Sequence, residues 1–431
     1  LLVYNQAIYD IMVVPRQVEN LDTAMFCSIF EISKEVFENK MAVVSKNLFY
    51  YSPSEFIKQV SGEKYALFLE HSHKFRGFYG ETRTIRNYMQ ACAAHILGDV
   101  GEVDSADITN SDYYYQPRDY AGKSGLEKLY DDNLRGARGY KYVFIDKYNK
   151  QQGSFDEGRN DSLPSQGANL ATTLDIKLQA YGERLLQNKV GSIVAIEPQT
   201  GEVLALVSSP SFDPNLLCGS ERGKNYSQLV KDPLKPLFNR AVMAQYPPGS
   251  TFKPLTAVIA MQEKAISPNF PYSCNTLFYI PGYTLHCSHS HPSAKNVQQA
   301  IQHSCNPYFW QTFKNTLEIG TYKNTGESYA KWYDYNTKFG LDSPLGIDML
   351  SEKAGNIPTP EYYNNLYGKG SWRAGTIISL AIGQGEILLT PLQLANLYAT
   401  FANRGHYITP HLVKSINGKP NPKPQRHETG I

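Results

Sequence analysis

Apolar and polar residues alternate irregularly through the first third of the chain. Residues 2–14 alternate as a strand does, and residues 140–146 predict a second strand. Residues 28–42 and 53–60 are predicted as helices. The polar stretch 151–167, which is punctuated by glycine and proline, predicts a linker.

The pattern changes after residue 168. Residues 169–174 read as a strand, and Asp175 is placed to cap a helix that runs through Leu186. A Pro-Gln-Thr-Gly turn between apolar runs predicts a β-hairpin over residues 191–208. Apolar helices are predicted at residues 252–262, 297–304 and 391–402. Strands and helices mix without a repeating strand–helix–strand unit, so the predicted fold class is α+β.

Length allows two or three domains, and composition is that of an ordinary folded protein. The chain has 431 residues, and a single core seldom grows beyond about 250–300. We place an N-terminal domain at residues 1–165 and a second domain at 166–431. Lysine and arginine total 42 against 40 acidic residues, which argues against the strongly basic class that binds nucleic acid. The end of the chain, residues 421–431, is predicted as loop without a closing strand or helix.

The residues around Ser250 carry the strongest chemical signal. Two prolines and Gly249 predict a tight turn, and the apolar run that follows predicts a buried helix, so Ser250 is expected in the first helical turn. Lys253 follows three residues later, on the same face. A serine hydroxyl becomes a nucleophile when a base takes its proton, and a lysine amine can be that base if burial lowers its pKa. The spacing alone is common, so the surrounding residues decide.

Residues 246–254, Tyr-Pro-Pro-Gly-Ser-Thr-Phe-Lys-Pro, closely resemble the nucleophile motif of penicillin-binding proteins. Ser304-Cys305-Asn306 resembles the Ser-x-Asn element of the same family. Residues 122–136 resemble the N-terminal pedestal of class B members, and residues 201–215 and 382–395 resemble parts of their transpeptidase domain. The elongation type is the better match, and the division type is the close alternative.

This resemblance implies a peptidoglycan D,D-transpeptidase. Ser250 would form an acyl-enzyme with a stem peptide, and β-lactams would acylate the same serine. Ser304 would relay a proton between Lys253 and the leaving amine, and Asn306 would hold both the substrate and Lys253. A serine β-lactamase is an alternative on the same fold, but the large N-terminal region argues against it.

The resemblance also implies partners and a location. The pedestal would act as a docking module for a rod-shape-determining scaffold protein of the MreC type and for a SEDS-type glycosyltransferase of the RodA type. Because Leu1 begins within a strand pattern, we expect further sequence upstream of it. The resemblance implies that this upstream part contains a membrane-anchoring helix and that the protein is periplasmic, held at the bacterial inner membrane.

The third element of the family, Lys-Ser/Thr-Gly, should follow well after Pro410, and it is not found between Pro410 and Ile431. Glu428-Thr429-Gly430 lacks the lysine, and we interpret it as a coincidence. We therefore expect residues 1–431 to lack a complete active site.

Cysteine and histidine residues gather between residues 274 and 305. Thiolate and imidazole ligands suit Zn²⁺ in a closed tetrahedral site. The resemblance to elongation-type enzymes that hold zinc beside the cleft implies four ligands, with His289 the rival to the histidine among them: Cys274, Cys287, His291 and Cys305. Free thiols or a Cys274–Cys287 disulfide are the alternatives. No cofactor is expected for the catalytic reaction itself.

Overall fold

The computed structural model describes residues 1–46, 53–146, 151–422 and 424–431. The chain forms two compact units. The first consists of Leu1–Ala168 and Phe212–Lys235, and the second of Asn169–Ser211 and Pro236–Ile431. The sequence pattern gave no sign that Phe212–Lys235 would join the first unit. Both units mix helices and strands, which confirms the α+β class.

The first unit contains short helices and three small sheets among its described residues. Its strands are β1 (Val3–Val13), β2 (Ser54–Val60), β3 (Phe78–Tyr88), β4 (Val100–Glu102), β5 (Tyr120–Gly122), β6 (Val143–Ile145) and β7 (Gln151–Ser154). Its α-helices are α1 (Thr23–Phe30), α2 (Lys34–Lys46), α3 (Gly62–Glu70), α4 (Ala94–Leu97), α5 (Ser105–Asn110), α6 (Gly125–Leu129), α7 (Asp131–Leu134) and α9 (Arg222–Lys231). The 3-10 turns are η1 (Pro15–Gln17), η2 (Ser72–Lys74), η3 (Phe155–Gly158) and η4 (Pro214–Leu217).

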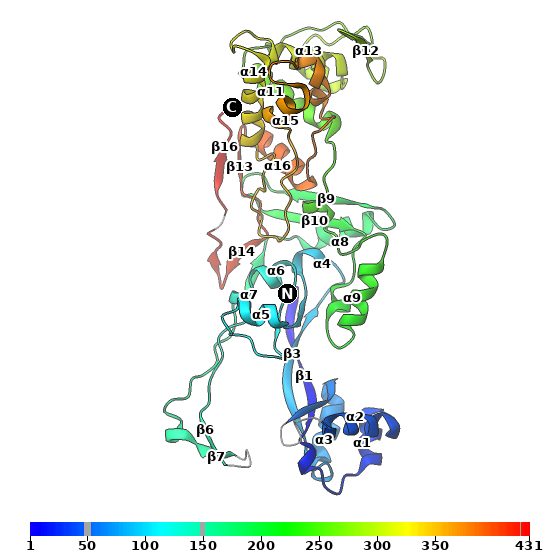
Figure 1. Ribbon diagram of the computed structural model, residues 1–431, viewed down its shortest axis with the longest axis vertical. Helices are drawn as coiled ribbons and strands as arrows, with labels where there is room; N and C mark the ends of the chain where they lie inside the picture. Colours follow the sequence, from blue (N-terminus) through cyan, green and yellow to red (C-terminus); the bar gives the residue numbers. More distant parts are fainter. Residues whose placement is uncertain (47–52, 147–150, 423) are drawn as a thin grey trace. The chain divides into compact units, whose positions relative to one another are not determined.

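A three-stranded antiparallel sheet organises the first unit, with strand order β2-β1-β3 (Figure 1). β1 pairs with β3 over its whole length. Phe26 of α1 is fully buried, and its ring contacts five other phenylalanine rings, those of Phe30, Phe37, Phe56, Phe75 and Phe78. This aromatic cluster packs the helices α1 and α2 against the sheet.

Two helix predictions in the first unit are wrong. Residues 53–60 were predicted as a helix, but Ser54–Val60 forms β2, because pairing with β1 satisfies the backbone groups and the strand buries Phe56 and Val60. Residues 28–42 were predicted as one helix, but they span α1 and α2. Glu31 adopts a left-handed conformation with φ 54° and ends α1 there.

The strand predictions in this unit are confirmed. β1 lies within residues 2–14, and the shorter β6 lies within residues 140–146. The stretch predicted as a linker, residues 151–167, begins with β7, which pairs with β6 in antiparallel fashion.

The second unit holds the long helices. Its α-helices are α8 (Ile176–Leu185), α10 (Arg240–Met243), α11 (Lys253–Gln262), α12 (Val297–Gln302), α13 (Asn306–Leu317), α14 (Thr325–Lys338), α15 (Pro360–Tyr367) and α16 (Pro391–Ala402), with 3-10 segments η5 (Gly249–Phe252) and η6 (Ala374–Ile382). Its strands are β8 (Leu170–Thr172), β9 (Gly191–Ile196), β10 (Val203–Ser209), β11 (Leu277–Ile280), β12 (Tyr283–His286), β13 (His406–Ile408), β14 (Val413–Ile416), β15 (Lys419–Pro420) and β16 (Arg426–Glu428).

Most predictions for the second unit are confirmed. β9 and β10 form the predicted hairpin, and the Asp175 carboxylate caps α8 by accepting from two backbone N–H groups. The helices α11, α12 and α16 lie where the sequence placed them. The prediction for residues 421–431 is wrong, because Arg426–Glu428 pairs with β13 as the strand β16.

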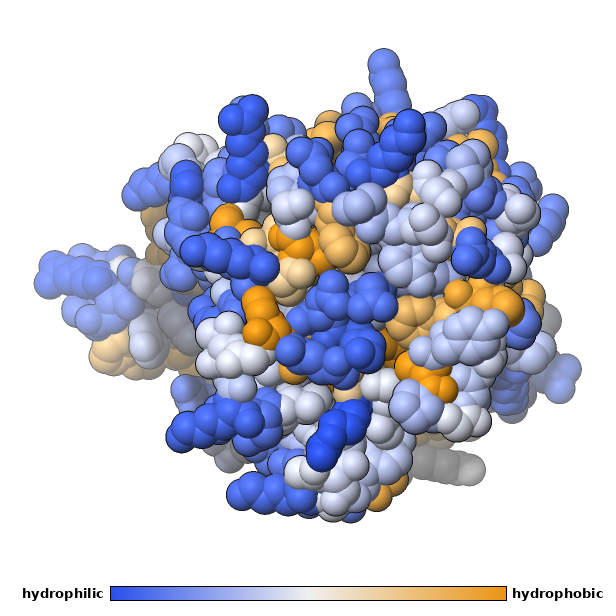
Figure 2. All heavy atoms as spheres, turned by 90° about the horizontal axis from the view of Figure 1, so that it is seen from above, coloured by the Kyte–Doolittle hydropathy of each residue, from blue (hydrophilic) through white to orange (hydrophobic). Residues whose placement is uncertain are grey.

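The core of the second unit surrounds α11 and α13. Its largest fully buried side chains include Phe252, Tyr308 and Trp332. The end of this unit that carries α13, α14 and β12 presents mainly hydrophilic side chains, with separate apolar patches between them (Figure 2). Among the described residues, no helix combines the length and the apolar character that crossing a bilayer requires.

Candidate active site

Ser250 lies in η5, the tight turn that leads into α11. Gly249 has a φ of 58°, a conformation that residues with a side chain rarely adopt, and so turns the chain into η5. The Lys253 N–H donates to the Ser250 carbonyl, which makes η5 continuous with α11. The sequence placed Ser250 in the α-helix itself, whereas the structure places it one 3-10 turn earlier. Ser250 is exposed, and its hydroxyl has no hydrogen-bond partner among the residues that the structure describes.

Lys253 is buried, with 1% of its surface exposed. Its ammonium group donates three hydrogen bonds, to the Ser304 carbonyl at 2.7 Å, to the Ser304 Oγ at 2.9 Å and to the Asn306 Oδ1 at 2.6 Å. Burial lowers the pKa of Lys253 from 10.5 to about 8. A lysine amine with such a pKa is neutral in a useful fraction of molecules near neutral pH, so it can accept a proton.

Ser304 occupies an unusual backbone position at the end of α12. Its φ is 50°, in the left-handed region. The Cys305 N–H donates to Ala300 and the Ser304 N–H donates to Ile301, at 3.1 and 3.0 Å. These two bonds form the Schellman motif, in which glycine usually holds the left-handed place. A serine there costs about 1–2 kcal/mol, and it directs both its carbonyl and its hydroxyl to Lys253.

Cys305 and Asn306 begin the next helix, α13. The Cys305 Sγ accepts from the Tyr308 N–H at 3.4 Å and so acts as the N-cap of α13. The triplet Ser304–Asn306 therefore joins the end of one helix to the start of another. The fully buried Cys305 thus lies directly between the two residues that contact Lys253, so a shift of Cys305 would move both of them.

Four potential metal ligands lie together behind this junction. The ligand atoms of Cys274, Cys287, His291 and Cys305 all lie within 4.8 Å of one another. The Cys287 Sγ is 3.4 Å from the His291 Nε2. Tetrahedral Zn²⁺ with bonds of about 2.0–2.3 Å needs donors of this kind and at about this spacing, so the set fits the ion. All six cysteines are free, so the alternative of a Cys274–Cys287 disulfide is absent from the structure.

The surroundings of this set separate the two candidate histidines. The His289 Nε2 lies 2.9 Å from the His303 carbonyl and its Nδ1 lies 3.0 Å from the Ser288 Oγ, so both ring nitrogens have other partners. The His291 Nε2 faces the thiol cluster. Burial acts to raise the pKa of the Cys287 thiol, but hydrogen bonds from the Asn306 N–H and from His291 outweigh it and lower that pKa.

One residue near Ser250, Gly383, entered the sequence analysis only as part of a stretch that resembles the transpeptidase domain, and no function was assigned to it. The Gly249 N–H donates to the Gly383 carbonyl at 2.8 Å, directly before Ser250. Gly383 is buried and lies at the end of η6. The sequence signals for it were this resemblance and the Gly-x-Gly pair at residues 383 and 385.

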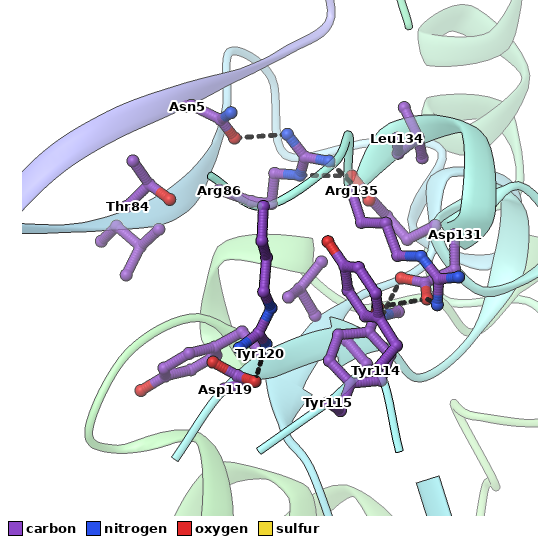
Figure 3. A pocket seen from close by; sticks show the side chains of 16 residues that line it. Asn5, Thr84, Arg86, Tyr114, Tyr115, Asp119, Tyr120, Asp131, Leu134 and Arg135 are labelled. Atoms are coloured by element: carbon purple, nitrogen blue, oxygen red, sulfur yellow. Dashed lines mark hydrogen bonds and ion pairs between the residues drawn. The ribbon is translucent and has the colours of Figure 1, made fainter. Parts of the chain in front are cut away.

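A pocket of about 420 Å³ lies in the first unit, lined mainly by residues of β3, β5, α7 and the adjoining loops (Figure 3). Each arginine of its lining pairs with a carboxylate: Arg86 with Glu127, Arg135 with Asp132 and Arg138 with Asp119. None of the predicted catalytic residues lines it. Because its charges are compensated and it lacks the Ser–Lys pair, we place the candidate active site at Ser250 and not here.

Comparison with known proteins identifies the family. Residues 191–429 match the model of the penicillin-binding protein transpeptidase domain, and residues 1–172 match the penicillin-binding protein dimerisation domain. The peptidoglycan D,D-transpeptidase MrdA of Acinetobacter baumannii is 36% identical over 362 residues, which cover 82% of this chain and 51% of the relative. MrdA of Escherichia coli K12 is 30% identical over 447 residues, covering all of this chain and 67% of the relative. The chain thus spans about half to two thirds of the length of these relatives.

A solved structure supports the fold over both units. The complex of penicillin-binding protein 2 (PBP2) with MreC from Helicobacter pylori matches with a TM-score of 0.80 at 23% identity, covering 100% of this chain and 77% of that one. The matching models, the identity to MrdA and the motif order agree with the resemblance seen in the sequence. The chain therefore belongs to the class B penicillin-binding proteins, which join a dimerisation domain to a transpeptidase domain, and it is similar to penicillin-binding protein 2.

Proposed function

We propose that the protein is a serine-type D,D-transpeptidase that cross-links peptidoglycan stem peptides during cell-wall elongation. One observation carries the proposal: the buried Lys253 amine bridges the Ser304 and Asn306 side chains, three residues after an exposed serine in a tight turn. The similarity to MrdA supports the choice of substrate. The division-type enzyme of the same class is the second candidate.

In the proposed reaction Ser250 is the nucleophile and Lys253 is the base. The neutral Lys253 amine takes the Ser250 hydroxyl proton while Oγ attacks the carbonyl carbon of the penultimate D-alanine. The peptide bond to the terminal D-alanine breaks, and its nitrogen receives a proton through the Ser304 hydroxyl. An amine of a second stem peptide then attacks the acyl-enzyme and releases Ser250.

Two further groups would hold the substrate in this reaction. The Ser250 N–H lies in the first turn of η5, where backbone N–H groups lack helical acceptors, and would donate to the developing oxyanion. The Asn306 side chain would donate from its amide nitrogen to the substrate peptide while its Oδ1 accepts from Lys253.

Labelling by a fluorescent penicillin tests the nucleophile. In the whole protein, Ser250→Ala should abolish labelling, because no oxygen remains to form the acyl bond. Ser267→Ala is the matched control, since Ser267 is an exposed serine beyond the far end of α11. Labelling of Ser250→Ala at the wild-type rate would overturn the proposal.

We also propose that the cluster of three cysteines and one histidine binds Zn²⁺. Cys274, Cys287, His291 and Cys305 would hold the ion, which would supply a structural cross-link and no catalytic step. A fixed Cys305 would hold its neighbours Ser304 and Asn306 in place for Lys253.

Elemental analysis of protein purified without a chelator tests the metal proposal. About one zinc per chain is expected for the wild type and for His289→Ala, and much less for His291→Ala. The two histidines are two residues apart, so each serves as the control for the other. Protein that contains no zinc would contradict the metal site, and zinc lost only with His289→Ala would contradict the ligand assignment.

We infer that the first unit docks a scaffold protein of the MreC type and a glycosyltransferase of the RodA type, on the periplasmic side of the inner membrane. The complex of H. pylori PBP2 with MreC supports the scaffold partner. Binding assays with Ser250→Ala test this role separately from catalysis. Retained binding of the MreC-type protein with lost penicillin labelling is the expected result, and loss of both would argue against a separate docking role.

A further inference from the structure

The loop that carries Ser250 is attached to a second segment at three points. Tyr246 and Leu389 exchange two backbone hydrogen bonds of 2.9 Å. The Gly249 N–H donates to the Gly383 carbonyl at 2.8 Å, and the Thr256 Oγ1 donates to the Ala381 carbonyl at 3.0 Å. Residues 381–389, which we call the support segment, therefore follow the loop from before Ser250 into α11.

Gly383 lies against the loop with no room for a side chain. It is left-handed, with a φ of 67°, and a Cβ at this position would lie 2.4 Å from the Gly249 carbonyl oxygen and 2.6 Å from the Phe252 Cβ. The first of these atoms belongs to the backbone, and the second belongs to a side chain that is fully buried. Neither can yield without movement of the chain between them, and Ser250 lies in that stretch.

We propose that Gly383 is a positioning residue for Ser250. Because glycine has no Cβ, η5 can pack directly against the support segment at Gly383. This contact fixes the position of the Ser250 Oγ relative to the Lys253 amine. The inference rests on the proposed function, because it assumes that Ser250 is the nucleophile. It assigns no chemical step to Gly383 itself.

The effect of contact can be separated from the effect of backbone strain. Gly370 has a φ of 75°, and a Cβ there would meet nothing within 4 Å. Gly370→Ala thus imposes the left-handed strain alone, whereas Gly383→Ala adds the collision. Gly385 is an intermediate case in the same segment, because its Cβ would meet the Ser379 Oγ, the end of a side chain that can rotate.

The test measures acylation of the whole protein by a fluorescent penicillin at several concentrations. This separates the affinity of the first complex from the rate constant of acyl-bond formation. For Gly383→Ala we expect the rate constant to fall roughly 10²-fold, the loss typical of a displacement of about 1 Å between reacting groups. The affinity of the first complex should stay close to that of Gly370→Ala, while the melting temperature should fall below that of Gly370→Ala because the added Cβ overpacks a buried contact.

Other outcomes decide against the inference. A Gly383→Ala rate constant equal to that of Gly370→Ala would overturn it, because the contact would then have no effect on Ser250. If Gly383→Ala does not fold, Thr256→Val answers the question, since it loosens the same attachment without adding volume. An unchanged rate constant in Thr256→Val would then overturn the inference.

Ser250→Ala belongs in the same series. If it still labels, the proposed function fails. If it does not label while Gly383→Ala behaves as Gly370→Ala does, only the positioning role fails.

Discussion

Two helical segments at the candidate site end with the same backbone geometry, but one has serine and the other has glycine at the left-handed position. Ser304 lies just after the end of α12 and Gly383 just after the end of η6, and both residues are left-handed. Both ends also carry the same pair of backbone hydrogen bonds: in η6, the Gly383 N–H donates to Leu380 and the Gln384 N–H to Ser379, each at 3.1 Å. Glycine adopts this conformation without a penalty, whereas serine does not.

The difference shows what each end must provide. The end at Ser304 supplies a carbonyl and a hydroxyl to Lys253, so a side chain is needed there despite its strain. The end at Gly383 supplies space, because the loop before Ser250 lies against it. The same left-handed helix end thus presents a side chain to Lys253 at Ser304 and leaves room for a neighbouring backbone at Gly383.

Removal of the Lys253 amine, which Ser304 contacts, should have the largest effect on the rate of acylation. Lys253→Met deletes the amine that hydrogen-bonds Ser304 and that we propose as the base, so penicillin acylation should become roughly 10³-fold slower. Stopped-flow or gel-based labelling measures the rate. Lys295→Met, at an exposed lysine, is the control and should label normally. A loss of less than about tenfold would contradict the role of Lys253 as base.

Two substitutions of Ser304 separate its chemistry from its strain. Ser304→Ala and Ser304→Gly both lose the hydroxyl, so both should acylate roughly 10²-fold more slowly. Only the glycine variant relieves the left-handed strain, so its free energy of unfolding should exceed that of the alanine variant by about 1 kcal/mol. Urea denaturation measures this difference. Equal stability of the two variants would show that Ser304 is not strained.

The pH dependence of acylation should follow Lys253. Burial lowers its pKa to about 8, and the neutral amine is the form that we propose as the base, so the rate should rise with pH and level off above about 8. Below that pH the slope should approach tenfold per unit. A rate that is constant through this range would contradict the assignment.

The same shift predicts a change in stability. The unfolded chain holds the Lys253 proton up to the ordinary pKa of 10.5, while the folded chain releases it near 8. The folded state is therefore penalised in full below about pH 8, and the penalty disappears as the pH rises towards 10.5. The gap in unfolding free energy between wild type and Lys253→Met should change over this window and stay constant below it.

Metal removal should have the smallest effect on the acylation rate, and it should act on the helix end at Ser304 and not on the one at Gly383. If Zn²⁺ holds Cys305, a chelator should loosen the neighbouring Ser304 and slow acylation by roughly tenfold. The melting temperature should fall as well, because bound metal stabilises the folded state. Thermal scans and labelling before and after dialysis measure both, and restored zinc should reverse them. Unchanged values would leave Ser304 held by its backbone bonds alone.

Local signals predicted the fold best where one residue fixes the chain. Asp175 predicted the start of α8, and the Pro-Pro-Gly turn predicted the bend before Ser250. Residues 53–60 were misread because their pairing with β1, which is distant in sequence, decides their structure. A short segment does not reveal such a partner.

The candidate site shows the same division. The spacing of Ser250 and Lys253 is local and was visible in the sequence. The contact of Lys253 with Ser304 was expected only through the resemblance to a family, because spacing does not tell which helices pack together. The role of Gly383 was missed because it depends on close contact with the Gly249 backbone, which is far away in sequence. That residues 1–431 lack a complete site remains a prediction.

The path of the chain between the two units has a consequence for exchange between genes. Phe212–Lys235 belongs to the first unit although the transpeptidase match runs across it. Within the first unit, Arg222 of this segment pairs with Asp99 at 2.6 Å. A single recombination breakpoint near residue 168 would replace Arg222 without Asp99. Hybrids of two such proteins should therefore fold less stably unless both residues come from one parent or the second parent supplies an equivalent pair.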